Sequence, residues 1–568
     1  MSRYRGSLAI GCLFVLITNG LALLGPWVLK KAIDQLQVEI TTQALLKFGG
    51  LIVFLALVEG VFRFLMRKTI ISVSRWVEYD LRNDFFAHLQ KLPQRFYHRV
   101  KTGDLMARAT NDLEAVRQVA GPAIMYSANT LVSMSAFVIM AYLNWKLTLM
   151  AMLPFPIMAV IVHRLARRLN QVHLEIQTQY ADITSKVQEN LSGIRIVKAY
   201  CQEEGETKQF SGLNREFISL NLRMAKIRGL MTAAMTFLVG VGSLIILWLG
   251  GQQVILGHIS LGSFVAFFAY LSMLTWPMIA LGWVINLVQQ GAASMGRMNR
   301  IFETKPDICD NENTDQSVVR LDGEIEFRDL SFSYNGVPVL KNINLLIKKG
   351  QTLAIVGPTG SGKTTLINLI PRLIEAPVGT LRIDGRDIRK IPVAVLRKNV
   401  GYVPQDTFLF SDSLENNIAF GTPDATFEDV GEAAEVAQIR NDILEFPQKF
   451  ETLLGERGIN ISGGQKQRTA LARAVIRKPT ILILDDSLSA VDTYTEEAIL
   501  THLRKIMRDR TSIIVSHRVS TVKDADLIVF MDDGKITERG THADLLTQSG
   551  AYASLYEKQL LEEALASY

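Results

Sequence analysis

The sequence is poor in cysteine, and two long stretches lack charge altogether. Its three cysteines, Cys12, Cys201 and Cys309, are too far apart to indicate a disulfide framework or a metal site. No Asp, Glu, Lys or Arg occurs in residues 7–29 or 229–296. The net charge is only +6 in 568 residues, so nucleic acid is not indicated as a partner. These absences argue against a disulfide scaffold and direct attention to the apolar stretches.

The chain is too long for one compact domain and too apolar for a wholly soluble protein. Hydrophobic residues make up 48% of it, and the mean hydropathy is +0.19. The first apolar stretch, Ser7–Leu29, follows a basic N-terminus as a signal peptide would. It is longer than the apolar core of a typical signal peptide, and more apolar stretches follow it. We therefore expect it to be a retained membrane helix.

Apolar stretches predict six membrane spans, since a spanning helix needs about 20 mostly apolar residues. Four are Ser7–Leu29, Phe48–Met66, Gln118–Trp145 and Leu147–Val162. The uncharged stretch Gly229–Gly296 is long enough for two more spans, and we expect the break between Gly250 and His258.

Lysine and arginine predict the orientation of the spans. Both residue types are frequent in 63–117 and 163–228 and absent from 34–43 and 251–262. By the positive-inside rule, the N-terminus, the two long loops and the C-terminal half lie in the cytoplasm. The loops are also helix-like, and about 25 helical residues reach about 40 Å. The spans are therefore expected to continue far into the cytoplasm.

Two charged residues, Glu59 and Arg63, lie inside the second predicted span, four residues apart on one helix face. A charge in the middle of a bilayer is costly. The two charges either compensate each other or line a substrate cavity, and the sequence leaves both readings open.

Residues 357–364 fit the phosphate-binding motif G-x-x-x-x-G-K-[ST]. They follow the strand-like run 353–356 and precede the helix-like run 365–370, which is the context that this motif requires. Glycines let successive amides turn toward phosphate oxygens, and the helix N-terminus adds positive potential. The candidate phosphate-binding residues are Gly357, Gly360, Ser361, Gly362, Lys363, Thr364 and Thr365. Among them, Lys363 is expected to reach the outer phosphates and Thr364 to bind Mg²⁺.

A second glycine-containing segment makes the family specific. Ser462, Gly463, Gly464 and Gln465 precede a hydrophobic strand that ends in Asp485. This order resembles the signature of ATP-binding cassette (ABC) proteins. The resemblance covers nearly the whole chain and extends to type IV, multidrug-resistance-like bacterial exporter half-transporters. It implies an all-α membrane domain in 1–302, a linker in 303–320 and an α/β P-loop ABC ATPase domain in 321–568.

The resemblance also assigns roles to single residues. Tyr334 would stack on adenine, and His517 would stabilise the γ-phosphate. Gln405 would contribute an oxygen to Mg²⁺ and to the attacking water, and Asp485 would hold Mg²⁺ through water. The segment Gly455–Gly458 resembles an exporter-specific loop. Short coupling helices seated on a cassette would fall near Thr110–Arg117 and Ala199–Gly205.

The residue after Asp485 departs from the family pattern. A glutamate usually stands there as general base, whereas this chain has Asp486. The shorter side chain withdraws the carboxylate by about 1 Å, and misplacement on that scale can cost about 10²-fold in rate. The signature is nearly intact, with Ile461 in place of the commoner leucine, and His517 is retained. Since two cassettes of this family enclose each ATP head to tail, the resemblance implies one weak and one competent site.

The sequence therefore predicts an ATPase-coupled exporter that uses ATP and Mg²⁺. As one half of a heterodimer, it would move a hydrophobic or amphipathic drug, lipid or peptide across the bacterial cytoplasmic membrane by alternating access. Its partner would be a second half-transporter with glutamate at the base position. Alternatives are a homodimeric exporter, a lipid flippase and an ATP-gated protein that does not pump. Six spans argue against a soluble ABC ATPase.

Overall fold

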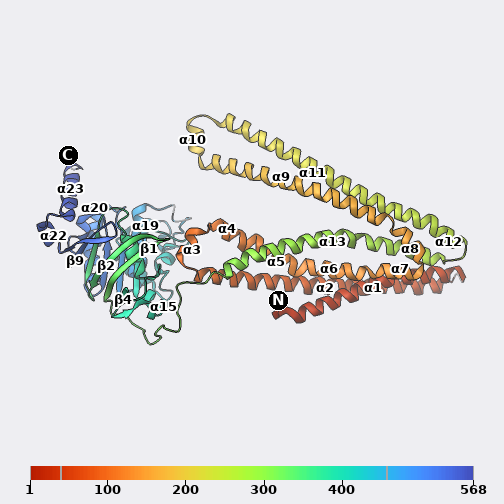
Figure 1. Ribbon diagram of the computed structural model, residues 1–568, viewed down its shortest axis with the longest axis horizontal. Coiled ribbons are helices and arrows are strands. Elements are labelled where there is room, and N and C mark those ends of the chain that lie inside the picture. The colour runs from red at the N-terminus through yellow and green to blue at the C-terminus, as the bar shows by residue number, and fades with distance from the viewer. Residues whose placement is uncertain (1, 39–40, 456–457, 459, 567–568) are drawn as a thin grey trace. The chain divides into compact units, whose positions relative to one another are not determined.

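The structure is a computed structural model that describes residues 2–38, 41–455, 458 and 460–566. Its contacts divide the chain into two units, each considered by itself (Figure 1). The helical unit extends to Ala87 and resumes from Gly103 to Glu303. The sheet unit contains His88–Thr102 and the chain from Thr304 onward.

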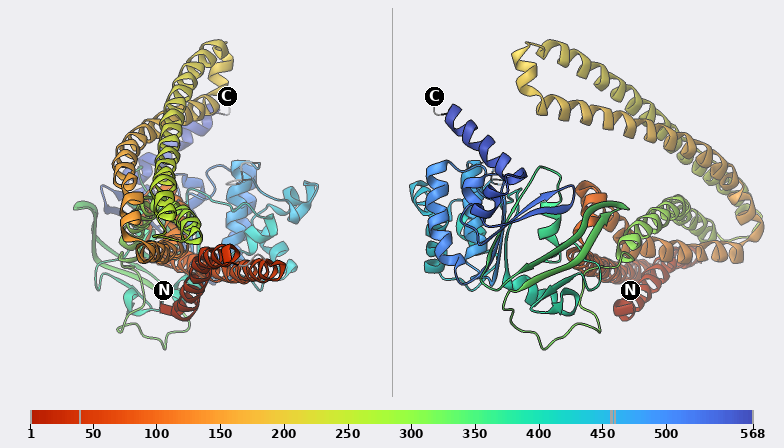
Figure 2. Two further views of the ribbon diagram at one scale, coloured as in Figure 1. Left: turned by 90° about the vertical axis from the view of Figure 1, so that its right-hand side faces the viewer. Right: turned by 60° about the vertical axis from the view of Figure 1, so that its left-hand side comes forward.

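Long helices build the helical unit, and short breaks separate them. The first half contains η1 (Ser2–Tyr4), α1 (Arg5–Val38), α2 (Thr42–Lys91), α4 (Thr102–Ala107), η2 (Arg108–Asp112), α5 (Leu113–Gln118), η3 (Val119–Ala123), α6 (Ile124–Ser133) and α7 (Ser135–Leu143). The second half contains α8 (Trp145–Met152), α9 (Pro154–Ser192), α10 (Ile194–Ala199), α11 (Glu203–Ile245), η4 (Ile246–Gly250), α12 (Gly251–Ile255) and α13 (Leu261–Phe302). Helices α9 and α11 lie side by side, with α10 between them at one end (Figures 1 and 2).

Five helices among the described residues are long and apolar enough to cross a membrane: Arg5–Gln37, Thr42–Lys91, Thr102–Leu143, Trp145–Ser192 and Glu203–Ile255. The sixth predicted span falls in α13, whose described side chains give a shorter apolar stretch, Leu261–Leu274. The turn before α13 lies at residues 256–260, so it overlaps the C-terminal end of the expected break, at His258.

Polar side chains connect these helices in pairs. The Asn19 amide of α1 donates to Asn129 Oδ1 of α6 at 2.6 Å. The Asp34 carboxylate accepts from Gly262 N at 2.9 Å and from Ser260 Oγ at 3.0 Å, so it caps the start of α13. Such pairing satisfies polar groups that lipid cannot.

The two charges in the second span also pair, because Arg63 Nη2 bonds Glu59 Oε1. This contact favours the reading in which they compensate each other.

The first predicted coupling segment, Thr110–Arg117, is not a separate short helix. Residues 110–117 lie inside a continuous helical rod from Thr102 to Leu143. The short helix comes earlier, as α3 (Gln94–Arg99), where Arg99 Nη2 donates to Asn335 Oδ1 of the sheet unit at 2.8 Å. The second short helix is α10, which ends at Ala199, and the predicted segment 199–205 continues from there over the turn at 200–202 into the start of α11. Helical propensity continues through the first predicted segment, so composition alone did not locate the break before it.

The sheet unit has two sheets. The first has the order β2-β1-β4-β5 and is antiparallel, with β1 (Ile325–Tyr334), β2 (Val337–Ile347), β4 (Leu381–Ile383) and β5 (Arg386–Asp387). The second has the order β10-β9-β3-β8-β7-β6, with β3 (Thr352–Val356), β6 (Val400–Val403), β7 (Ile481–Asp485), β8 (Thr511–Val515), β9 (Leu527–Asp532) and β10 (Lys535–Gly540). Every pair of neighbouring strands in this sheet is parallel except the pair β9–β10, which is antiparallel. Strands buried in a parallel sheet have continuous apolar sequences.

Helices surround the two sheets. They are α14 (Lys363–Leu369), η5 (Ile388–Lys390), α15 (Val393–Asn399), α16 (Leu414–Ala419), α17 (Phe427–Val436), α18 (Arg440–Glu445), η6 (Lys449–Glu451), α19 (Gly463–Val475), α20 (Thr493–Met507), α21 (Val519–Val522), α22 (His542–Thr547) and α23 (Ala551–Ala566). One apolar core joins α16–α20 to one face of the second sheet, and a second core lies between the two sheets.

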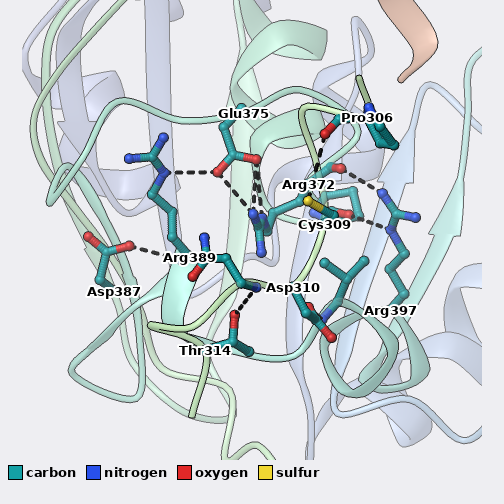
Figure 3. Close-up of polar contacts among 12 residues, drawn as sticks. Pro306, Cys309, Asp310, Thr314, Arg372, Glu375, Asp387, Arg389 and Arg397 are labelled. Carbon is teal, nitrogen blue, oxygen red and sulfur yellow. Dashed lines mark hydrogen bonds and ion pairs between the residues drawn. The ribbon is translucent and has the colours of Figure 1, made fainter. Parts of the chain in front are cut away.

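The segment after α13 is bound to the sheet unit along its length. Asp310 Oδ1 accepts from Val393 N at 2.9 Å, and Asp315 N donates to Lys390 O at 2.8 Å. Figure 3 shows this segment beside Arg372, which is 2% exposed and pairs with Glu375. The predicted linker is therefore a docked strap within the sheet unit.

Candidate nucleotide-binding site

Three parallel strands bring the predicted motifs to one edge of the sheet. In the register, Ile355 of β3 and Asp485 of β7 both pair with Val515 of β8. The carboxyl ends of these strands therefore meet, and the segments that follow each strand share one edge. Open α/β sheets bind ligands outside the carboxyl ends of their strands.

The phosphate loop, residues 357–362, follows β3 directly and ends where α14 begins. Gly357 has φ +148°, and a Cβ there would lie 2.1 Å from Met531 O. Gly362 has φ +95°, and its Cβ would lie 2.9 Å from Leu340 Cδ2. Only glycine fits at these two positions, so the loop backbone is fixed and its amides are available at the start of α14.

The Lys363 side chain lies in the centre of this loop. It is 6% exposed, and its Nζ donates to Gly357 O and Pro358 O at 2.8 Å each. Burial lowers the pKa of the Lys363 ammonium, while the carboxylates of Asp485 and Asp486 oppose that shift. The lysine is thus held by main-chain oxygens at the place where the motif requires a cation for phosphate.

Oxygen atoms beside the loop fit a magnesium ion. Asp485 is 1% exposed, and its Oδ2 has no hydrogen-bond partner among the described residues. The buried Ser361 Oγ has none there either. Burial raises the pKa of Asp485, a hydrogen bond with Thr364 opposes the rise, and the charge of Asp486 adds to it. A divalent cation would satisfy the buried carboxylate oxygen, since carboxylate and hydroxyl oxygens are the ligands that Mg²⁺ prefers.

Asp486 and His517 follow β7 and β8 at the same edge. Asp486 has φ +46°, its N donates to Val515 O at 2.8 Å, and its carbonyl accepts from Ser489 Oγ at 3.0 Å. Aspartate is one of the few residue types enriched in this left-handed region. His517 is half-buried and lies two residues after the end of β8.

Two further predicted residues are exposed. Gln405 lies just after β6, whose Val403 pairs with Leu484 of β7, so it reaches the same sheet edge. Tyr334 ends β1, is 42% exposed and packs edge-on against Phe332 with ring centroids 5.0 Å apart. Strand β2, its hairpin partner, passes the phosphate loop, because a Cβ at Gly362 would lie 3.1 Å from Val339 O.

The signature residues start helix α19. Ser462 is its N-cap: its Oγ accepts from Gln465 N at 3.2 Å, and Gln465 Oε1 accepts from Ser462 N at 3.0 Å. Gly464 lies against Ser489–Asp492, a segment that resembles the D-loop of the family: a Cβ at Gly464 would be 2.9 Å from Ala490 O. Among the described residues, no hydrogen bond or ion pair joins the signature to the phosphate loop, so one chain presents them as separate surfaces.

The exporter-like loop 455–458 lies partly outside the described residues. Residues 456 and 457 of the exporter-like loop 455–458 are not among the described residues.

The structure adds one buried residue that the motifs did not single out, Gln467. It is 6% exposed, and its Nε2 donates to Ser489 Oγ at 3.0 Å while its Oε1 accepts from Ala490 N at 2.9 Å. It therefore ties the signature helix to the D-loop, whose Ser489 in turn holds the Asp486 carbonyl. Its only sequence signal is its place two residues after Gln465.

Comparison with known proteins agrees with this geometry. The family model for the ABC transporter transmembrane region matches residues 8–278, and the ABC transporter model matches residues 340–489. A probable multidrug resistance ABC transporter ATP-binding/permease protein of Bacillus subtilis, YheI, is 37% identical, over 97% of this chain and 95% of its own. The Escherichia coli multidrug resistance-like ATP-binding protein MdlA is 36% identical, over 99% and 95%. An ATP-dependent lipid A-core flippase of Syntrophus aciditrophicus is 35% identical, over 98% and 93%.

Among solved structures, a bacterial Atm1-family ABC exporter with ATP bound superposes with a TM-score of 0.81 at 28% identity. The match covers 98% of this chain and 99% of that one. The fold and site therefore define a multi-pass membrane protein with an attached ABC ATPase. The chain belongs to the ABC transporter family, as an ATPase-coupled translocase of the exporter type.

Asp442 anchors the signature helix, and this contact predicts a pH dependence. It accepts from Gln465 Nε2 at 2.9 Å and from Arg468 Nη1 at 2.8 Å. Burial alone would raise the pKa of Asp442, but these hydrogen bonds outweigh it and hold the pKa below its usual value. A carboxylate with a lowered folded pKa adds stability above its unfolded pKa, about 3.9, and loses it as the pH falls through the folded value.

We expect Asp442→Asn to lower the thermal unfolding midpoint of the purified complex at pH 7. The difference from the unmodified protein should stay constant down to about pH 5 and shrink below about pH 4, where Asp442 itself becomes protonated. Asp424→Asn, at an exposed carboxylate, serves as the control. An Asp442→Asn difference that is unchanged below pH 4 would show that the ion pair does not contribute.

Proposed function

We propose that this chain is the subunit with the weaker ATP site in a heterodimeric exporter. The observation that carries the proposal is an asymmetry within one cassette. The signature forms a complete capping box at Ser462 and Gln465, whereas the residue after Asp485 is the shortened base Asp486. Since each ATP lies between the phosphate loop of one cassette and the signature of the other, the partner's ATP would receive a serviceable signature.

The roles of the site residues follow from their places. The amides of 357–362 and the Lys363 ammonium would bind the phosphates, and Tyr334 would stack on adenine. Thr364, Gln405 and Asp485 would hold Mg²⁺, which supplies neutralisation of the phosphate charge. Asp486 would accept a proton from the attacking water, and His517 would stabilise the γ-phosphate. Ser462–Gln465 would face the partner's nucleotide.

The partner, substrate and location belong to the same proposal. The partner would be a non-identical ABC half-transporter with glutamate at the base position. The substrate would be a hydrophobic or amphipathic molecule (a drug, a lipid or a peptide), since relatives include multidrug-resistance-like proteins and lipid A-core flippases by name. Bacterial relatives support the cytoplasmic membrane as the location, and the basic loops support a cytoplasmic ATPase.

Coupling would use a groove of ≈ 210 Å³ on the sheet unit. Three arginines, Arg397, Arg473 and Arg477, line it, and its lining includes no carboxylate. The Arg473 guanidinium lies 5.7 Å from the Phe420 ring, and burial lowers the pKa of Arg473 to about 10. Such a lining favours an acidic or aromatic occupant. We propose that a short cytoplasmic helix of the partner subunit docks in this groove.

The asymmetry predicts unequal effects for two substitutions. Ser462→Arg should lower steady-state ATPase by about 10²-fold, because it damages the signature of the competent site. Asp486→Asn should leave turnover nearly unchanged, because a site slowed about 10²-fold contributes about one hundredth of the total. Asp486→Glu, which restores the usual length, should raise turnover by at most about twofold. All three are measured on the purified native complex.

A homodimer predicts otherwise, because each substitution would then affect both sites. A severe loss from Asp486→Asn, equal to that from Ser462→Arg, would refute the asymmetric scheme and identify Asp486 as a working base.

The groove predicts an uncoupled variant. Phe420→Ala should leave basal ATPase within about twofold, since Phe420 belongs to none of the nucleotide motifs, yet reduce the ATP-dependent change in distance between spin labels on the outer ends of the spans. Phe427→Ala is the matched control, because both rings are 60% exposed and Phe427 lies on α17 outside the groove. An unchanged distance response in Phe420→Ala would remove the groove from the coupling path.

A further inference from the structure

The C-terminal helix α23 contacts the main chain on both sides of His517. Gln559 Nε2 donates a hydrogen bond to His517 O, and Gln559 Oε1 accepts one from Val519 N at 2.8 Å. One amide side chain thus spans the residues that flank Arg518, 40 or more positions earlier in the chain. Gln559 lies beyond residues 340–489, which the ABC transporter model matches.

Within the turn itself, Ser516 Oγ accepts a hydrogen bond from Arg518 N at 3.0 Å. Residues 516–518 lie between β8 and α21 and belong to neither. Arg518 is the N-cap of α21, and its side chain makes no capping hydrogen bond. The first amides of a helix lack partners within the helix, so Gln559 supplies a cap that the local sequence does not.

A second contact holds this turn from the opposite direction. The Arg518 guanidinium pairs with Glu496 of α20, which is 3% exposed, and Thr521 Oγ1 also donates to Glu496. The turn is therefore fixed through a side chain by α20 and through its main chain by α23.

Helix α23 is itself anchored two turns before Gln559. Glu538 of β10 accepts from Ala551 N at 2.6 Å and from Tyr552 N at 3.2 Å. Tyr552 is fully buried, and its hydroxyl lies 2.7 Å from His542 Nδ1. Because α23 is anchored by these contacts, Gln559 holds a fixed position relative to the turn at 516–518.

We propose that Gln559 is a positioning residue for His517. Its amide fixes the main chain at 517 and 519 and thereby sets the direction of the imidazole toward the γ-phosphate. The proposal rests on the role of His517 in the proposed function. It makes the C-terminal helix part of the ATP site without any contact to the nucleotide.

The first arm of the test measures the clamp without hydrolysis. In the purified complex, Gln559→Met keeps the side-chain length and removes both hydrogen bonds. Deuterium exchange of the peptide that spans 516–522 should quicken by about tenfold, the scale of one lost hydrogen bond. Gln548→Met, at an exposed glutamine in the preceding turn, should leave it unchanged. Unchanged exchange in Gln559→Met would overturn the proposal, whatever the kinetics.

The second arm measures positioning in a double variant, Asp486→Glu combined with Ser462→Arg. In this background the partner's ATP site is damaged and the base of this chain's own site is lengthened, so turnover reports on this chain's own site. There, Gln559→Met should lower kcat by about tenfold or more and leave the KM for ATP within about twofold, because the phosphate loop is untouched. Gln559→Glu keeps an acceptor for Val519 N but replaces the donor to His517 O with a second carboxylate oxygen, which repels that carbonyl. The kcat of this variant should therefore fall as well.

The two arms separate the failures. Faster exchange with unchanged kcat in an active background would overturn the positioning role. A background that shows no turnover would contradict the weakened-base scheme, and the exchange arm would still decide whether the clamp exists.

Discussion

The parallel register of β3, β7 and β8 is the constraint on which the ATPase depends. It brings the phosphate loop, the Asp485–Asp486 pair and His517 to one sheet edge, although they are far apart in sequence. Hydrogen bonds along the ladder set that alignment, and a shift of one residue would turn Asp485 to the opposite face. The remaining contacts refine positions that this ladder has already fixed.

Electrostatics at that edge favour a nucleotide with its metal. Burial lowers the pKa of Lys363 and raises the pKa of Asp485, so each charged form is less favourable without further partners. Phosphate oxygens would favour the lysine cation, and Mg²⁺ would favour the aspartate anion. Burial of Lys363 and Asp485 therefore costs folding stability, and it also makes the binding of ATP depend strongly on the phosphate and Mg²⁺ charges that match these two side chains.

Two amide side chains extend the site into the rest of the cassette. Gln467 ties the signature helix to the D-loop, and Gln559 ties the C-terminal helix to the turn after β8. In a dimer, the first link would connect the two ATP sites within one chain, because the signature serves one site and Asp486 the other. Communication between sites needs such a contiguous physical path, and the hydrogen bonds provide a specific candidate.

The sequence predicted the fold class well, because membrane spans and phosphate loops have strong local signals. Apolar length marked the helices, and the strand-loop-helix context marked 357–364. The first short helix was misplaced, because residues 102–143 stay helical through the π-turns η2 and η3, and the one local signal before α3, Pro93, was not used. The docking of 304–320 and the clamps of Gln467 and Gln559 depend on tertiary contacts between distant segments, which leave no periodic pattern to read.

Binding of Mg²⁺-ATP at this sheet edge can be measured by site-resolved labelling. The native complex would be exposed to a photoreactive ATP analogue with Mg²⁺, and label on each subunit would be quantified by mass after separation. For Lys363→Ala, we predict a large loss of label from this chain, with label on its partner retained, because a buried cation of the phosphate loop is gone. Equal labelling of this chain with and without Lys363 would show that ATP does not bind at this loop.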